Sequence, residues 1–344
     1  MTARVCYYRH PMLRVFVCLS VFVVAGLSCA AASVEKIGPD LYAYISDNDS
    51  SANSTFLIGD TGILVVDTGL NPQEGGKLLD EIRKLSPLPV RWIVNTHYHP
   101  DHRGGNSAFG PDVVIISTGY TRQQVLKALA EQSAKSGEKP AVEYALNETL
   151  DREVTLYLGS HEVRIYHPGP AHTRGDLVVY FPDQHAIATG DLFLTNSCPY
   201  MDDGDLDNWI VALEDVLDLP VQHVIPGHFA LATKKDAGFF RDYLAELRAQ
   251  AARLYRRNMS LEQTKAALKL DRFKSLRQFP QYEATFADNA AAYYRQLEIR
   301  RRRNQGAPRA QSQPANNGPS SKMSVCLAGR GCVSRQIAPL WYKL

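Results

Sequence analysis

Cysteine is scarce in this 344-residue chain, and its placement excludes a fold held together by disulfides. Three of the six cysteines precede residue 33, which leaves Cys198, Cys326 and Cys332. An odd number cannot form a complete disulfide framework, although Cys326 and Cys332 could pair in an oxidising compartment. Cys198 stands in no recognisable nucleophile motif, and we expect an ordinary packed or loop thiol at that position.

Long hydrophobic runs are also nearly absent, apart from one near the N-terminus. Three arginines precede the apolar run Val15–Leu27, whose 13 residues fall short of the ~20 that a membrane-spanning helix needs. Small residues follow it up to Ala32 and fit a cleavage site. We therefore predict a signal peptide over 1–32, export to the periplasm or secretion, and no stable membrane insertion after cleavage. Lipoprotein anchoring at Cys29 is the alternative.

The central part of the chain lacks an excess of positive charge. The formal net charge is +2, but residues 1–32 and 304–344 are basic and contain no acidic residue. Residues 33–303 alone hold 30 basic and 36 acidic residues. Since nucleic-acid surfaces lean toward positive charge, this balance argues against a nucleic-acid partner.

Short apolar runs separated by turn residues predict two groups of β-strands, each flanked by amphipathic helices. We expect an α/β architecture in which two sheets pack face to face and helices cover both outer faces. The expected strands are 41–45, 54–59, 62–69, 90–95, 112–117, 154–159, 161–167, 176–182, 185–191 and 221–225, and the expected helices begin near residues 71, 120 and 207.

After residue 236 the pattern becomes fully helical. An amphipathic stripe opens this region, and further helices are expected from Ser260 and over 283–303. The C-terminal segment is rich in Gln, Pro, Asn, Ser and Gly, a composition typical of disorder. We therefore predict a domain over 33–235, a helical C-terminal extension over 236–303 packed on it, and a disordered tail over 304–344.

Three of the ten histidines lie within six residues, in the segment Val94–Gly105 with the sequence VNTHYHPDHRGG. Alternate side chains of an extended segment point the same way, so His97 and His99 can reach one metal ion. After Pro100 the chain must turn, and Asp101 and His102 then face a neighbouring position. We expect the glycine pair at 104 and 105 to permit this sharp turn and to start the next element without side-chain clash.

Further candidate ligands follow at other strand ends. His172 precedes the strand expected at 176–182, Asp191 ends the one at 185–191, and His228 follows the one at 221–225. Loops held by a rigid scaffold commonly supply the residues of a metal site. We expect Asn196 and Tyr200 to border the same pocket, and Asp67 to hold its loops together without binding metal.

These motifs in this order resemble the metallo-β-lactamase superfamily: VVDTG at 65–69, H-x-H-x-D-H, G-x-x-H-T, T-G-D and P-G-H. The resemblance covers about residues 34–235 and implies a four-layer αββα sandwich with a dinuclear centre at one edge of the sheets. It assigns one ion to His97, His99 and His172, a second to Asp101, His102 and His228, and a bridging position to Asp191. The implied cofactors are two Zn²⁺ ions, with iron or manganese as alternatives.

The resemblance to particular subgroups differs from motif to motif. Zinc β-lactamases of the commonest subgroup have a cysteine in the third motif, whereas this chain has Asp191 together with His102, as in glyoxalase II-like and lactonase-like hydrolases. The family mechanism implies that a metal-bridging hydroxide, oriented by Asp101, attacks the carbonyl of a small ester, lactone, thioester or amide, β-lactams included. The alternative on the same fold is a mononuclear iron oxidoreductase of the persulfide dioxygenase type.

Overall fold

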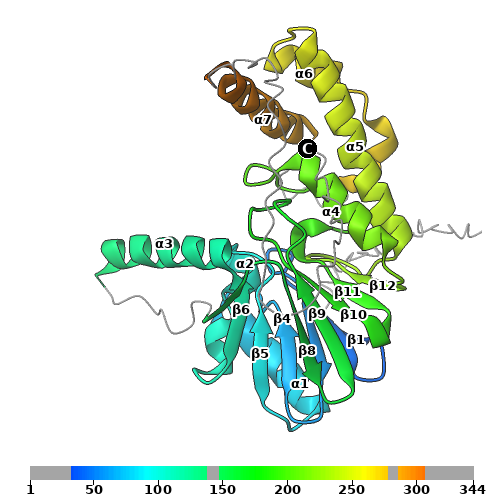
Figure 1. The fold of residues 1–344 in the computed structure, drawn as a ribbon. Helices are drawn as coiled ribbons and strands as arrows, with labels where there is room; N and C mark the ends of the chain where they lie inside the picture. Colours follow the sequence, from blue (N-terminus) through cyan, green and yellow to red (C-terminus); the bar gives the residue numbers. More distant parts are fainter. Residues whose placement is uncertain (1–31, 138–146, 278–285, 307–344) are drawn as a thin grey trace, which may run out of the picture. The chain divides into compact units, whose positions relative to one another are not determined.

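The computed structural model describes residues 32–137, 147–277 and 286–306 (Figure 1). The chain divides into a unit that ends at Arg300 and a second unit that begins at Arg301. Of the second unit the structure describes only the last turn of one helix. The architecture below is that of the first unit.

Seven strands form the first sheet in the order of the sequence, β1 to β7. Neighbours from β1 to β4 are antiparallel, whereas β4, β5, β6 and β7 run parallel. The carboxyl ends of these parallel strands therefore lie at one edge of the sheet. The strands are β1 (Ser33–Lys36), β2 (Leu41–Ile45), β3 (Ser54–Ile58), β4 (Ile63–Val66), β5 (Val90–Val94), β6 (Val114–Thr118) and β7 (Glu148–Leu150).

Five strands form the second sheet in the order β12-β11-β10-β9-β8. All neighbours are antiparallel except β11 and β12. The strands are β8 (Glu153–Leu158), β9 (His161–Tyr166), β10 (Val178–Phe181), β11 (Ala186–Ala188) and β12 (His223–Ile225).

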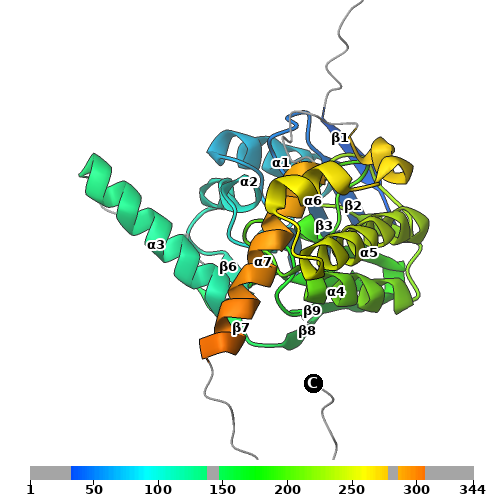
Figure 2. The same cartoon turned by 90° about the horizontal axis from the view of Figure 1, so that it is seen from above.

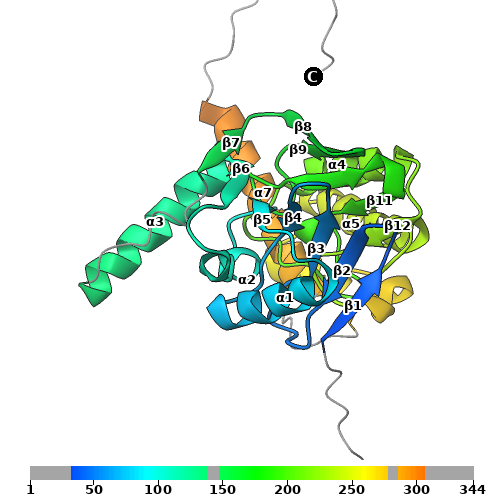
Figure 3. The ribbon, with the colours of Figure 1, turned by 90° about the horizontal axis from the view of Figure 1, so that it is seen from below.

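Seven α-helices surround the sheets in the described residues. The end of α3 projects away from the sheets in Figures 1, 2 and 3, and only its first turns bury side chains, Thr121 and Val125. The helices are α1 (Pro72–Leu85), α2 (Pro100–Arg103), α3 (Gly119–Ser136), α4 (Leu206–Asp218), α5 (Lys234–Arg256), α6 (Leu261–Ala267) and α7 (Phe286–Gly306).

Three hydrophobic clusters separate four layers, which confirms the predicted αββα sandwich. Residues along β4 alternate between two clusters: Leu64 and Val66 face the second sheet, whereas Ile63 and Val65 pack toward α1. This alternation is the period of two expected for a strand buried on both faces. The third cluster lies between the outer face of the second sheet and α4, α5 and α7. Figure 2 shows α7 beside α5, where the Tyr243 and Phe286 ring centroids lie 5.1 Å apart.

The starts of α1 and α6 are capped by side chains. Asn71 caps α1 by accepting a hydrogen bond from the Glu74 amide at 3.0 Å, with proline in the first turn. Ser260 and Gln263 form a reciprocal capping box at α6. Both caps satisfy amides that have no partner within the helix.

Two strands were not predicted, and both are short. β1 is almost wholly exposed, so it shows no alternation of polar and apolar residues, and β7 has only three residues. The predicted signal peptide lies outside the described residues except for Ala32, as do Cys326, Cys332 and nearly all of the predicted tail. No helix within the described ranges combines the length and the apolar character needed to span a membrane.

Candidate metal centre

The candidate ligands gather where parallel strands end. His97 lies three residues after β5, and α2 carries Asp101 and His102. Asp191 lies in a 3₁₀ turn, η4 (Gly190–Leu192), directly after β11, and His228 follows β12. In sheets of this kind, ligands bind beyond the carboxyl ends of the strands.

The first group of donor atoms belongs to His97, His99, His172 and Asp191, all within 4.8 Å of one another. The Nδ1 atom of His99 lies 3.0 Å from His97 Nε2 and 3.1 Å from His172 Nε2. His172 Nε2 lies 3.4 Å from Asp191 Oδ2. Ligand atoms 2.0–2.1 Å from a tetrahedral ion are about 3.3 Å apart, so this spacing fits one small metal ion.

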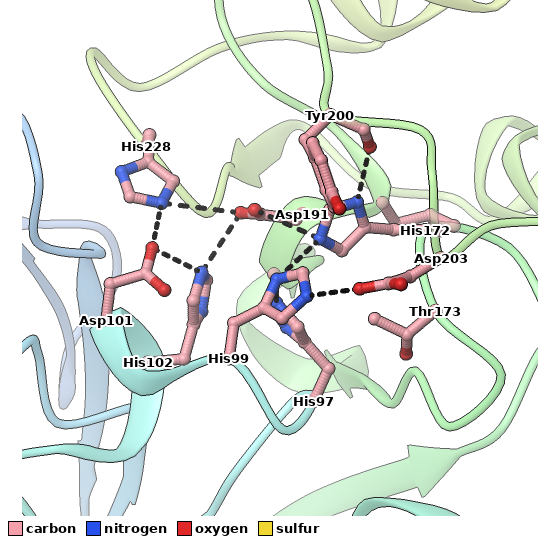
Figure 4. A network of polar contacts seen from close by, with 12 residues as sticks. His97, His99, Asp101, His102, His172, Thr173, Asp191, Tyr200, Asp203 and His228 are labelled. Atoms are coloured by element: carbon pink, nitrogen blue, oxygen red, sulfur yellow. Dashed lines mark hydrogen bonds and ion pairs between the residues drawn. The ribbon is translucent and has the colours of Figure 1, made fainter. Parts of the chain in front are cut away.

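The second group consists of Asp101, His102 and His228. The Oδ2 atom of Asp101 lies 3.1 Å from His228 Nε2 and 3.6 Å from His102 Nε2. Asp191 faces this group with its other oxygen, since Oδ1 lies 3.2 Å from His102 Nε2 and 3.6 Å from His228 Nε2. Figure 4 shows Asp191 between the two groups. The structure thus brings together every residue that the sequence singled out as a metal ligand.

Asp67 fixes the orientation of two of these histidines. It follows β4 and is buried, and its Oδ2 lies 2.7 Å from His102 Nδ1 and accepts a hydrogen bond from the Thr96 hydroxyl at 2.7 Å. The same hydroxyl lies 3.1 Å from His97 Nδ1. Because each Nδ1 is held in this way, each Nε2 faces the site. Asp67 therefore orients His97 and His102, and it belongs to neither group of candidate ligands.

The loop after η4 orients the two remaining histidines of the first group. The Tyr200 carbonyl accepts a hydrogen bond from His172 Nδ1 at 3.1 Å. Asp203 Oδ2 lies 3.1 Å from His99 Nε2 and also accepts a hydrogen bond from the Tyr98 hydroxyl. Asp203 was not predicted, because no motif or spacing distinguishes it from other acidic residues of this loop. No motif or spacing in the sequence indicated a role for Tyr98 either.

The two glycines after His102 are required for one of the two predicted reasons, the absence of side-chain clash, and not for the other. Gly104 and Gly105 adopt ordinary right-handed backbone angles, with φ of −61° and −83°, so neither is needed for an unusual turn. A Cβ on Gly104 would lie 1.8 Å from the Leu70 carbonyl oxygen, and one on Gly105 would lie 2.1 Å from that of Thr68. Close approach of backbones, and not the turn itself, requires glycine here.

Burial and charge give the histidines different protonation tendencies. Burial, reinforced by the neighbouring imidazoles of His102 and His99, holds the pKa of His97 well below its ordinary value. Burial also lowers the pKa of His172 to about 4. Both imidazoles are therefore neutral at pH 7, as metal binding requires.

In the second group, the charges of neighbouring side chains affect the pKa values more than burial does. Burial lowers the pKa of His102, but the carboxylates of Asp191, Asp67 and Asp101 outweigh it and hold that pKa well above its ordinary value. Burial raises the pKa of Asp191, yet the imidazoles of His102 and His228 hold it well below the ordinary carboxyl range. Asp191 is thus ionised and able to bind cations with both oxygens.

The surroundings of one buried atom fit a bound cation. His102 is 0% exposed, and its Nε2 faces the carboxylate oxygens of Asp191 at 3.2 Å and Asp101 at 3.6 Å without a hydrogen bond to any residue in the described part of the chain. A cation between this nitrogen and the two carboxylates would satisfy all three groups at once. The nitrogen and carboxylate donors around this space are the types that zinc and related divalent ions prefer.

A cavity of about 700 Å³ opens onto the two groups. His99, Asp101, His172 and Asp191 reach it, together with residues of three surrounding segments. The segments contribute Asp49 and Ser50 before β3, Tyr200, Met201 and Asp202 after η4, and Asp288, Asn289, Ala291 and Arg295 of α7. Tyr200 borders the pocket as predicted. Asn196 instead lines a separate small cavity beside Phe193 and Phe239, so the prediction for Asn196 was wrong.

A family model described as the metallo-beta-lactamase superfamily matches residues 47–228, more than half of the chain. The chain is 24% identical over 213 residues to metallo-beta-lactamase type 2 from Elizabethkingia meningoseptica, covering 59% of this chain and 81% of the relative. It is 26% identical over 224 residues to 2,4-dinitroanisole O-demethylase subunit alpha from Nocardioides sp. strain JS1661, and the match covers 64% of this chain and 63% of the relative.

Among solved structures, the sec-alkylsulfatase Pisa1 from Pseudomonas sp. matches with a TM-score of 0.64 at 18% identity. The match covers 77% of this chain and 50% of that chain, and it shows a shared fold. The chain therefore spans less than two thirds of the demethylase subunit and half of the sulfatase.

Proposed function

Because the chain belongs to the metallo-β-lactamase superfamily and is a metal-dependent hydrolase of that fold, we propose that it works with two zinc ions. The proposed reaction is hydrolysis of an ester, lactone, thioester or amide carbonyl in a small molecule. We further propose that the chain is exported and that its signal peptide is removed before Ser33.

The position of Asp191 carries the dinuclear proposal. Its Oδ2 faces His172 of the first group at 3.4 Å, and its Oδ1 faces His102 of the second group at 3.2 Å. A carboxylate that is 2% exposed and has imidazoles on both sides is suited to joining two cations. A single ion would leave one of these oxygens and the buried His102 Nε2 unmatched.

The residues around the two groups would have different roles in the proposed reaction. Two bound ions would supply an activated water at neutral pH and polarise the carbonyl of the substrate. Asp101 is the member of the second group that reaches the cavity, so its carboxylate is placed to orient a nucleophilic water and accept its proton. Asp67 and Asp203 keep His102 and His99 in their orientations, which holds the geometry before substrate arrives.

The test combines metal analysis with turnover of the purified mature chain. We expect two equivalents of zinc per chain and hydrolysis of at least one member of a panel of esters, lactones, thioesters and β-lactams. His97→Ala and Asp191→Ala should each abolish turnover while circular dichroism stays unchanged. His223→Ala is the matched control, because this histidine is exposed on β12.

Two results would refute the proposal. One is unchanged turnover in either the His97→Ala or the Asp191→Ala variant. The other is one iron per chain with sulfur-dependent oxygen uptake, which would instead identify a persulfide dioxygenase. Export is tested separately by N-terminal sequencing of the chain recovered outside the cytoplasm, with Ser33 as the expected first residue.

A further inference from the structure

Helix α7 contributes no residue to either metal group, yet its side chains hold the segment from which Asp203 contacts His99. We propose that Gln296 of α7 is a positioning residue of the first group. It fixes the backbone beside Asp203 and so helps to determine how tightly this group binds zinc. The inference rests on the proposed function, because it concerns metal at that same site, but metal affinity and not turnover tests it.

Asp203 can orient His99 only while its own backbone is held in place. Its Oδ2 lies 3.1 Å from His99 Nε2 (Figure 4). With Nε2 held in this way, His99 Nδ1 faces the Nε2 atoms of His97 and His172 at 3.0 and 3.1 Å. Asp203 itself lies between η4 and α4, outside the helices and strands. Contacts other than those of regular secondary structure must therefore position its carboxylate.

The residue after Asp203 gives this segment conformational freedom that the fold must restrict. Glycine is required at position 204, since a Cβ there would lie 2.4 Å from the carbonyl oxygen of Ala171. Glycine loses more backbone freedom on ordering than any other residue. The Asp205 amide donates to the same Ala171 carbonyl at 2.8 Å. A contact that holds Gly204 against Ala171 therefore orders both the Asp203 segment and the residue before His172.

The side-chain amide of Gln296 makes that contact at two points. Its Nε2 donates a hydrogen bond to the Gly204 carbonyl at 3.0 Å, and its Oε1 accepts one from the Leu206 amide at 3.2 Å. One planar group thus bonds to the backbone on both sides of Asp205, using its donor and its acceptor together. Rotation of the backbone between Asp203 and Leu206 would break both bonds.

Helix α7 is anchored independently of Gln296. Phe286 and Tyr293 pack into the hydrophobic cluster that also contains residues of α4 and α5. Arg300 forms an ion pair with Asp205 at 3.1 Å, but exposed pairs of this kind contribute little to stability. Removing the Gln296 amide should therefore leave the helix in place and release the segment beside it.

The test measures the affinity of the purified chain for Zn²⁺ by competition with a chromophoric chelator. Gln296→Met keeps the length of the side chain but removes both hydrogen bonds, and Asp203→Ala removes the contact with His99. We expect each variant to lose at least about tenfold in affinity, the usual effect of losing a contact that orients a metal ligand.

Combining the two variants separates positioning from a general structural role. If Gln296 acts through Asp203, the double variant should bind Zn²⁺ no more than about twofold more weakly than Asp203→Ala alone. Two independent structural defects would instead multiply their losses.

Gln250 of α5 provides a matched control, because its side chain makes the same kind of two-point contact elsewhere. Its Nε2 donates to the Lys269 carbonyl at 2.9 Å, and its Oε1 accepts from the Lys269 amide at 2.8 Å. Both residues lie outside the two metal groups and the lining of the cavity. Gln250→Met should lower the urea midpoint at least as much as Gln296→Met, yet leave the Zn²⁺ affinity within about twofold of the wild-type value.

The outcomes separate this inference from the proposed function. Three results would each overturn the positioning role, whatever the chain hydrolyses: unchanged affinity in Gln296→Met, an equal loss in Gln250→Met, or fully multiplied losses in the double variant. The predicted coupling in a chain that hydrolyses none of the panel would support the positioning role and overturn the proposed reaction alone. A wild-type chain that binds no Zn²⁺ would overturn both.

Discussion

Two adjacent glycines in α1 provide a matched pair of substitutions that tests how the ligand loop is held. A Cβ on Gly76 would have no atom within 4 Å. A Cβ on Gly75 would lie 2.4 Å from the carbonyl oxygen of Gly105 and 2.7 Å from its Cα. Gly105 comes three residues after His102, so Gly75 packs directly against the backbone of the proposed metal-binding segment.

The two variants should change stability in opposite directions. Replacing a helix-interior glycine by alanine stabilises a protein by about 0.5–1 kcal/mol, and Gly76→Ala should gain this amount. Gly75→Ala gains the same helix propensity but forces α1 and the loop apart, and overpacking of this kind costs about 1–3 kcal/mol. Since the obstructing atoms belong to the backbone, we expect the upper part of this range and a difference of about 2–3 kcal/mol between the variants.

Urea unfolding of the chelator-treated protein measures this difference without a contribution from metal. Competition with a chromophoric chelator then measures zinc affinity, which we expect to fall about tenfold in Gly75→Ala and to stay unchanged in Gly76→Ala. Equal stability of the two variants would refute the close contact between α1 and the ligand loop.

Three further outcomes are expected. Asp67→Asn replaces the oxygen that faces His102 Nδ1 and should weaken zinc binding about 10–100-fold in chelator competition; unchanged affinity would contradict the orienting role. Removing metal should lower stability by about 2.7 kcal/mol for each bound ion relative to protein at free zinc 100 times the dissociation constant, seen as a lower melting temperature in calorimetry; identical melting curves would exclude structural coupling. Burial raises the pKa of Cys198 to about 12, so at pH 8 its thiol stays protonated. In a Cys326→Ser/Cys332→Ser mature chain, a disulfide reagent should detect one thiol only after unfolding.

The sequence was most informative where the chemistry depends on short spacings. His97, His99, Asp101 and His102 lie within six residues after a predictable strand, so their convergence follows from local geometry. His172, Asp191 and His228 could be added because each lies next to a strand with a clear apolar pattern. Their division into two groups came from the family resemblance and not from spacing.

The contacts that were missed depend on tertiary packing. Asp203 orients His99 across a sequence separation of 104 residues, from a loop without regular structure. The contribution of α7 to the cavity lining could not be predicted either. Amphipathicity shows that a helix buries one face, but not which loop its other residues border. For the glycine pair after His102, the predicted need to avoid a side-chain clash is confirmed, but its contacts with Leu70 and Thr68 could not be predicted because these residues are distant in sequence.

The distribution of the candidate ligands over both sheets has a consequence for how the protein acquires metal. Four of these residues lie between 97 and 102, in the segment that follows β5 of the first sheet, whereas His172, Asp191 and His228 come from segments that connect or follow strands of the second. Neither half of the chain contains a complete set for either group. Metal can therefore be held tightly only after the chain has been synthesised past residue 228 and the two sheets have docked, so loading follows folding, and bound metal would report that folding is complete.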